Sequence, residues 1–142
     1  MNEDNTKLSV MLVEDDPAHA EITLRSIEEL APLRCDIVHV VDGQAALERL
    51  RSMLSPPDLV LLDLRLPRLD GLELLALVQS DAALNQIPIV VLTTSDADTD
   101  RQRALAYGAS SYLVKPFGES ELLAVIRMLG CSSSCLQRTP AA

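Results

Sequence analysis

The most constraining feature of this chain is a short apolar run that ends on a single carboxylate. Residues 59–62 read Leu-Val-Leu-Leu, and Asp63 follows them directly. Strands that helices cover on both faces of a parallel sheet are continuous runs of this kind, so we interpret the run as a buried strand. Ligands bind at the carboxyl ends of the strands in such sheets. Asp63 is therefore a candidate for chemistry, although an isolated Asp at this place more often begins a turn or caps a helix.

Further apolar runs alternate with amphipathic segments along the chain. These runs cover residues 8–13, 35–41, 88–92 and 111–114. A helical pattern of apolar residues follows each run and also follows Asp63. Strand and helix units in succession predict an α/β fold with a parallel sheet, helices on both faces and right-handed connections.

Capping residues mark where several of the predicted helices begin and end. Asp16 before Pro17 predicts the start of the first helix, whose apolar face carries Ala20, Leu24 and Ile27. Asp70 is followed three residues later by Glu73, which is the pattern of a capping box. Gly108 predicts the end of the fourth helix, Gly130 that of the fifth.

Composition limits the size and the class of the protein. The 142 residues, of which 48% are hydrophobic and 2% aromatic, suffice for one domain with an aliphatic core. We expect this domain to cover residues 8–130, after a flexible N-terminus at 1–7 and before a disordered tail at 131–142. Since the chain ends soon after the fifth helical pattern, we expect a single-domain protein without a DNA-binding domain.

The charge and the cysteines exclude several classes of partner and compartment. The formal net charge is -9, and no basic stripe is present, so binding of nucleic acid is disfavoured. The sequence shows no signal peptide and no apolar stretch of the roughly 18–20 residues that span a membrane. The three cysteines form no even framework and fit reduced thiols. We therefore expect a soluble, cytoplasmic protein that does not bind membranes.

Polar residues follow the apolar runs at the places where the strands end. They are Glu14, Asp15, Asp63, Thr93 and Lys115. All carboxyl ends of parallel strands meet at one edge of the sheet, so we expect these side chains to lie together. Carboxylates at ~4 Å repel one another by about 4 kcal/mol at an effective dielectric near ~20, so a cation is needed. Oxygen ligands suit Mg²⁺, and a carboxylate beside Mg²⁺ can attack a phosphoryl group to form an acyl phosphate.

In this order and spacing the residues resemble the receiver domain of two-component response regulators. The resemblance covers about residues 8–130. It rests on the motifs Leu12-Val13-Glu14-Asp15-Asp16, Leu61-Leu62-Asp63-Leu64-Arg65-Leu66-Pro67, Asp70-Gly71, Leu92-Thr93-Thr94-Ser95, Gly108-Ala109 and Lys115-Pro116-Phe117. It implies a flavodoxin-like, doubly wound, five-stranded parallel sheet in the order 2-1-3-4-5.

The resemblance also implies roles for individual residues. Asp63 is expected to accept a phosphoryl group from a phosphohistidine on a sensor histidine kinase, as a step of phosphorelay signal transduction. Mg²⁺ is expected to bind Asp15, Asp63 and the backbone carbonyl of Arg65, with Glu14 acting through a metal-bound water. The hydroxyl of Thr93 and the amine of Lys115 then contact the phosphoryl group.

Further expectations come from the same resemblance. Tyr112 matches the aromatic residue whose rotation accompanies activation, and Arg65 occupies a variable position that affects the access of water to the phosphoryl group. Residues 67–71 and 92–96 are most similar to single-domain regulators paired with phytochrome-type sensor kinases. Output is expected through a protein-protein contact, with a homodimer through the fourth helix, fifth strand and fifth helix.

Other classes fit the motifs less well. A haloacid-dehalogenase-like phosphatase needs a second Asp where this chain has Arg65, and the run from Asp96 to Asp100 lacks the glycine and the last acid of a calcium loop. The glycines form no nucleotide-binding motif, and His19 and His39 are interpreted as ordinary surface or core residues. We expect a phosphoacceptor that catalyses only its own phosphoryl transfer and dephosphorylation, rather than an enzyme acting on other substrates. The alternative is a receiver-like binding module that acts without phosphorylation.

Overall fold

A five-stranded parallel sheet forms the centre of the molecule. The computed structural model describes residues 7–30, 34–66, 68–94 and 98–129. Neighbouring strands pair in parallel in the order β2-β1-β3-β4-β5, which confirms the predicted flavodoxin-like topology. The strands are β1 (Lys7–Val13), β2 (Arg34–Val40), β3 (Leu59–Asp63), β4 (Ile89–Thr93) and β5 (Ser111–Val114). Apart from Lys7, which begins β1, the predicted N-terminal and C-terminal tails lie outside the described residues.

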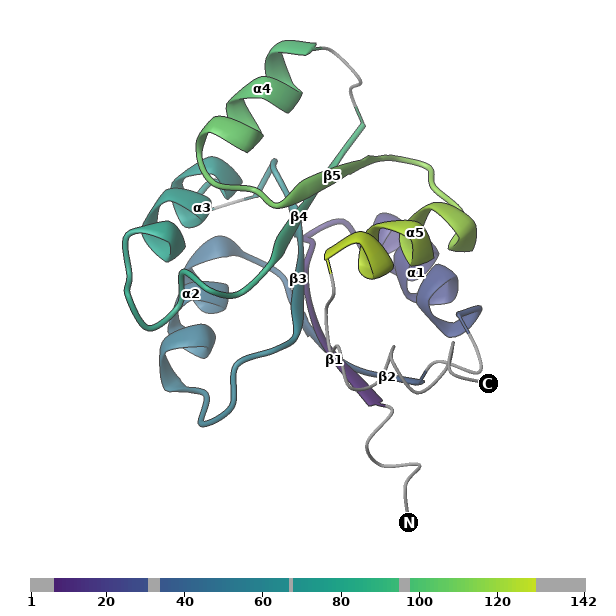
Figure 1. Ribbon diagram of the computed structural model, residues 1–142, viewed down its shortest axis with the longest axis horizontal. Helices are drawn as coiled ribbons and strands as arrows, with labels where there is room; N and C mark the ends of the chain where they lie inside the picture. Colours follow the sequence, from purple (N-terminus) through teal and green to yellow (C-terminus); the bar gives the residue numbers. More distant parts are fainter. Residues whose placement is uncertain (1–6, 31–33, 67, 95–97, 130–142) are drawn as a thin grey trace.

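Helices cover both faces of the sheet. They are α1 (Pro17–Glu28), α2 (Gly43–Ser52), α3 (Gly71–Gln79), α4 (Asp98–Ala106) and α5 (Glu119–Leu129). Figure 1 shows α1 and α5 together on one side of the sheet, and α2 and α3 on the other. Residues of β3 divide between the two resulting cores in strict alternation, as the pleat of a strand requires: Leu59 and Leu61 pack with α1 and α5, Val60 and Leu62 with α2 and α3.

Aspartates cap the helices that begin beside the carboxyl ends of the strands. The side chain of Asp16 accepts hydrogen bonds from the backbone N–H groups of Ala18 and His19 at the start of α1. Asp42 does the same for Ala45 in α2. The predicted capping box of α3 between Asp70 and Glu73 is present. Each cap satisfies N–H groups that have no partner within the helix.

The first turn of α3 passes very close to the end of β3. A Cβ atom placed on Gly71 would lie 2.6 Å from the Cα of Leu64 and 2.7 Å from the carbonyl oxygen of Asp63. The backbone N–H of Gly71 donates to the carbonyl of Leu64 at 3.1 Å. Only a residue without a side chain allows the helix to start this close to the strand.

Within the described parts of the chain, no helix is both long enough and apolar enough to span a bilayer.

Candidate functional site

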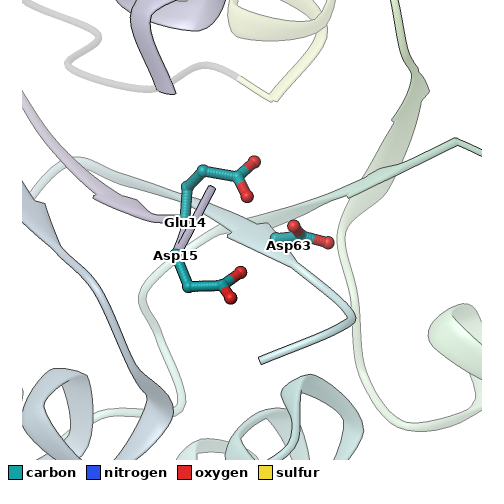
Figure 2. A group of neighbouring side chains, drawn as sticks. All are labelled: Glu14, Asp15 and Asp63. Carbon is teal, nitrogen blue, oxygen red and sulfur yellow. The ribbon is translucent and has the colours of Figure 1, made fainter. Parts of the chain in front are cut away.

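Three carboxylates meet at the edge of the sheet where the strands end. Glu14 and Asp15 follow the last residue of β1, and Asp63 is the last residue of β3, the strand beside it. Figure 2 shows the side chains of Glu14 and Asp15 converging with that of Asp63 around one space. One oxygen atom from each carboxylate lies within 4.8 Å of the other two. The predicted acid cluster is therefore present.

The donor set of this cluster fits a divalent cation. Glu14 is fully buried, Asp63 is buried and Asp15 is exposed, so the cluster opens to solvent on one side only. Carboxylate oxygens are ligands that Mg²⁺, Ca²⁺ and Mn²⁺ prefer, and Mg²⁺ keeps several waters beside one or two carboxylates. The open side at Asp15 leaves room for such waters.

Lys115 forms ion pairs with the acid cluster from across the sheet edge. Its Nζ lies 2.5 Å from Oε1 of Glu14 and 3.4 Å from Oδ2 of Asp63. Lys115 follows β5, and its backbone N–H donates to the carbonyl of Thr93 at 2.7 Å. The side chain is only 10% exposed, so the ion pairs are little screened by water. The lysine predicted from sequence is thus brought to the acids.

Burial perturbs the most enclosed of these acids. The pKa of Glu14 is raised to about 7, chiefly by desolvation and also by hydrogen bonding with Asp63 and repulsion by its charge, while Lys115 acts in the opposite direction. Removing a carboxylate from water disfavours its charged form unless a cation compensates. A cation bound at the cluster would restore the charged form of Glu14.

A hollow of about 210 Å³ adjoins Asp63 on the side of α4. Thr93, which is buried, and Arg65 line it beside Asp63. The backbone N–H of Arg65 donates to Oδ1 of Asp63 at 3.1 Å. Asp100 and Arg103 of α4 also line the hollow; from the sequence, Asp100 was considered only as part of a calcium loop, and Arg103 was not singled out. The hollow offers a group attached to Asp63 a hydroxyl and arginine side chains.

Tyr112 lies on β5 and contacts α4. The guanidinium carbon of Arg101 lies 5.3 Å from the centre of the Tyr112 ring, and its Nη1 donates to the phenol oxygen at 3.2 Å. Sequence reasoning singled out Tyr112 as an activation switch without identifying Arg101. The contact joins the predicted switch residue to the helix that borders the hollow.

His19 also lies in this region, and sequence reasoning did not place it there. Its Nδ1 lies 3.1 Å from Nζ of Lys115. The histidine pattern alone gave no signal, because no ligand spacing connects His19 to a residue 96 positions away. Its position three residues after the cap Asp16, on the turn of α1 nearest the strand ends, was the available indication.

Comparisons with known proteins agree with this geometry. The model of the response regulator receiver domain family matches residues 10–127. The probable methanogenesis regulatory protein FilR2 of Methanothrix harundinacea is 44% identical over 117 residues, which cover 80% of this chain and 75% of that protein.

Solved structures share the fold as well. The bacteriophytochrome response regulator AtBRR is 35% identical with a TM-score of 0.79, covering 87% of this chain and 93% of that one. The receiver domain of the sensor histidine kinase PA1611 from Pseudomonas aeruginosa PAO1, solved with a magnesium ion coordinated in its active site cleft, is 29% identical with a TM-score of 0.75, covering 87% and 98%. The family match over most of the chain, joined to an acid cluster and a lysine at the strand ends, means that this chain belongs to the response regulator receiver domains.

Proposed function

We propose that Asp63 is the phosphoacceptor of this receiver domain. Response regulator receiver domains are phosphoaccepting signalling domains that work with sensor histidine kinases. The observation that carries the assignment is the position of the Asp63 carboxylate, which lies 3.4 Å from Lys115, beside two other acids and on the wall of a hollow. No other aspartate of the described residues combines these features.

The proposed transfer makes one bond and breaks one. An oxygen of Asp63 attacks the phosphorus, and the bond between phosphorus and the imidazole nitrogen of the kinase breaks, its electron pair leaving with the imidazole. Lys115 neutralises charge on the transferred oxygens, and the hydroxyl of Thr93 donates a hydrogen bond to one of them. The chain catalyses this transfer and its own later dephosphorylation, in which Arg65 controls the access of water.

Mg²⁺ is the proposed cofactor, held by Glu14, Asp15, Asp63 and the backbone carbonyl of Arg65. When bound, the ion supplies positive charge to the phosphoryl oxygens. The acid cluster supports this assignment, as does the magnesium ion named for the PA1611 receiver. The carbonyl of Arg65 and the water-mediated role of Glu14 come from family resemblance alone.

The partners and the output are also proposals. The likeness to AtBRR supports a phytochrome-type sensor kinase as the phosphodonor. Rotation of Tyr112 is the proposed switch, read out by a protein-protein contact in the cytoplasm. The proposed contact is a homodimer through α4, β5 and α5, where Leu105, Tyr107 and Met128 are exposed.

Phosphorylation by acetyl phosphate and Mg²⁺ tests the proposal. We expect the wild type to incorporate acid-labile phosphate and Asp63→Asn to incorporate none, because the nucleophile is lost while shape and polarity remain. Asp58→Asn is the matched control, because Asp58 lies directly before the first residue of β3, far from the strand end at Asp63. Its side chain accepts a hydrogen bond from the backbone N–H of Ser9, and the amide oxygen of Asn can accept the same bond. Wild-type levels of phosphate on Asp63→Asn would refute the assignment.

The same assay separates the alternative function. A receiver-like binding module that acts without phosphorylation would take up no phosphate even as wild type. Its acid cluster and Lys115 would then serve only to hold the loops.

A further inference from the structure

The ammonium group of Lys115 has three acceptors around it. Besides Glu14 and Asp63, the third is Nδ1 of His19 at 3.1 Å. An ammonium group carries three N–H donors, so these acceptors use its full capacity. His19 therefore completes the hydrogen bonding of the one lysine assigned to phosphoryl contact.

The contact fixes which nitrogen of His19 carries its proton. Lys115 has no lone pair to offer, so Nδ1 must accept and is unprotonated. The proton of the neutral ring is then on Nε2, which faces Oδ2 of Asp16 at 3.9 Å. Asp16, already the cap of α1, thus favours the tautomer that binds Lys115.

Helix α1 holds His19 beside Lys115. His19, Thr23 and Ser26 lie on one face of this helix at spacings of four and three residues. Ser26 Oγ donates to the carbonyl of Phe117 at 3.4 Å, two residues after Lys115, and Thr23 is buried. One helix face therefore contacts both ends of the 115–117 segment.

We infer that His19 is a positioning residue, which holds Lys115 at the phosphoryl site by accepting its third hydrogen bond. The inference rests on the proposed function, since that function assigns Lys115 to the phosphoryl group. Glu14 and Asp63 belong to the acid cluster, so their bonds to Lys115 change whenever the charge of the cluster changes. His19 lies outside the cluster, and its bond to Lys115 remains.

The first test measures phosphorylation by acetyl phosphate, which needs no kinase and so excludes effects on kinase docking. We expect His19→Leu to lower the rate about tenfold, the order expected for losing one hydrogen bond to a charged group. His19→Asn should recover most of the rate, because its amide oxygen reaches nearly the position of Nδ1. Ile22→Ala is the control, because Ile22 is half exposed and lines, together with His19 and Lys115, a second hollow separate from the one at Asp63.

Non-additivity is the decisive readout of this assay. In a Lys115→Met background, His19→Leu should change the residual rate by less than about twofold, because a residue that acts through Lys115 has nothing left to position. An equal loss in both backgrounds, no recovery by His19→Asn, or an equal loss in Ile22→Ala would overturn the inference.

A second measurement does not depend on phosphorylation. The chain has two histidines, so the imidazole ¹⁵N signals of His19 and His39 can be assigned by single substitution. Lys115→Met should shift the Nδ1 signal of His19 and leave His39, which contacts the carbonyl of Glu14, nearly unchanged. An unmoved Nδ1 signal would refute the contact even if Asp63 is phosphorylated, whereas a shifted signal in a protein that takes up no phosphate would refute only the proposed function.

Discussion

The buried carboxylate of Glu14 makes the stability of the metal-free protein depend on pH. Its pKa is about 7 in the folded protein, against an ordinary value of 4.5, so the folded state binds this proton more tightly than the unfolded chain. The free energy of unfolding should therefore fall as pH rises between these two values and level off above them. At about 1.4 kcal/mol per pKa unit, this contribution is at most ~3.5 kcal/mol.

Glu14→Gln should remove that part of the pH dependence. Urea unfolding in metal-free buffer near pH ~5 and pH ~8 measures this dependence. Relative to the wild type, the variant should have a higher free energy of unfolding at pH ~8 than at pH ~5, because Glu14 of the wild type is charged at the higher pH. Glu48→Gln, an exposed acid on α2, should follow the wild type at both values. A Glu14→Gln curve parallel to that of the wild type would contradict the assigned burial cost.

Asp15 and Asp16 are neighbours with different roles, and melting with and without Mg²⁺ should distinguish them. Asp15→Ala should reduce the metal-induced rise in Tm and slightly raise the Tm of the metal-free protein, because a ligand and a repelling charge are removed. Asp16→Ala should lower the metal-free Tm, since the cap of α1 is lost, yet keep the metal-induced rise. An unchanged metal response in Asp15→Ala would count against Asp15 as a ligand.

The sequence predicted which polar residues the strand ends bring together, and it missed the neighbours that helices contribute. Glu14, Asp63 and Lys115 could be identified because parallel strands bring their carboxyl ends to one edge whatever the details of packing. His19 contacts Lys115, 96 positions away, and Arg101 of α4 contacts Tyr112 of the next strand, β5. No local pattern encodes those contacts, since they depend on how α1 and α4 are rotated against the sheet.

At the scale of the elements, the cap of α2 should matter more than the ion pair on its outside. Asp42 accepts a hydrogen bond from the backbone of Ala45 at 2.7 Å, and Arg68 lies 3.8 Å from the same carboxylate at the exposed surface. Asp42→Ala should cost about 1 kcal/mol of unfolding free energy, whereas Asp42→Asn keeps the cap and should cost little.

Arg68→Ala is the control for this comparison. Because exposed ion pairs contribute roughly 0–1 kcal/mol, the loss from this substitution should be small. Chemical denaturation of the three variants measures the difference, and a loss in Arg68→Ala as large as in Asp42→Ala would show that the ion pair dominates.

Local signals predicted where α1 and α3 begin, but they described the buried face of α1 incompletely. Ala20 and Ile27 are buried as the apolar spacing predicts, and Thr23 and Ser26 are buried beside them. A hydrophobic pattern cannot identify these two polar residues. The hydroxyl of Ser26 donates to the carbonyls of Ile22 and Phe117. The contact with Phe117 forms only when the chain folds, because the two residues are 91 positions apart.

At the scale of the whole molecule, the proposed homodimer should respond to charge on one face only. Light scattering before and after phosphorylation should show association in the phosphorylated state. Phosphorylation can promote dimerisation only if a second copy binds the phosphorylated conformation more tightly than the unphosphorylated one. Tyr107→Glu, just after α4, should prevent association by placing a charge in the interface.

Leu54→Glu provides the matched control for the dimer. Leu54 is fully exposed after α2, away from the α4-β5-α5 face, so its substitution should leave association unchanged. A strict monomer in both states would remove the dimer, and a dimer indifferent to Tyr107→Glu would place its interface elsewhere.

The tight start of α3 limits how this protein can diverge by mutation. Any side chain at Gly71 would collide with the backbone of Asp63 and Leu64, although Gly71 performs no chemistry itself. In a saturation library, replacements at Asp63 should give abundant protein without phosphate, whereas replacements at Gly71 should lower the abundance of folded protein. Both positions would be equally intolerant in a selection for signalling. Only a separate measurement of the cellular protein level would distinguish the loss of the nucleophile at Asp63 from the loss of folding caused by a side chain at Gly71.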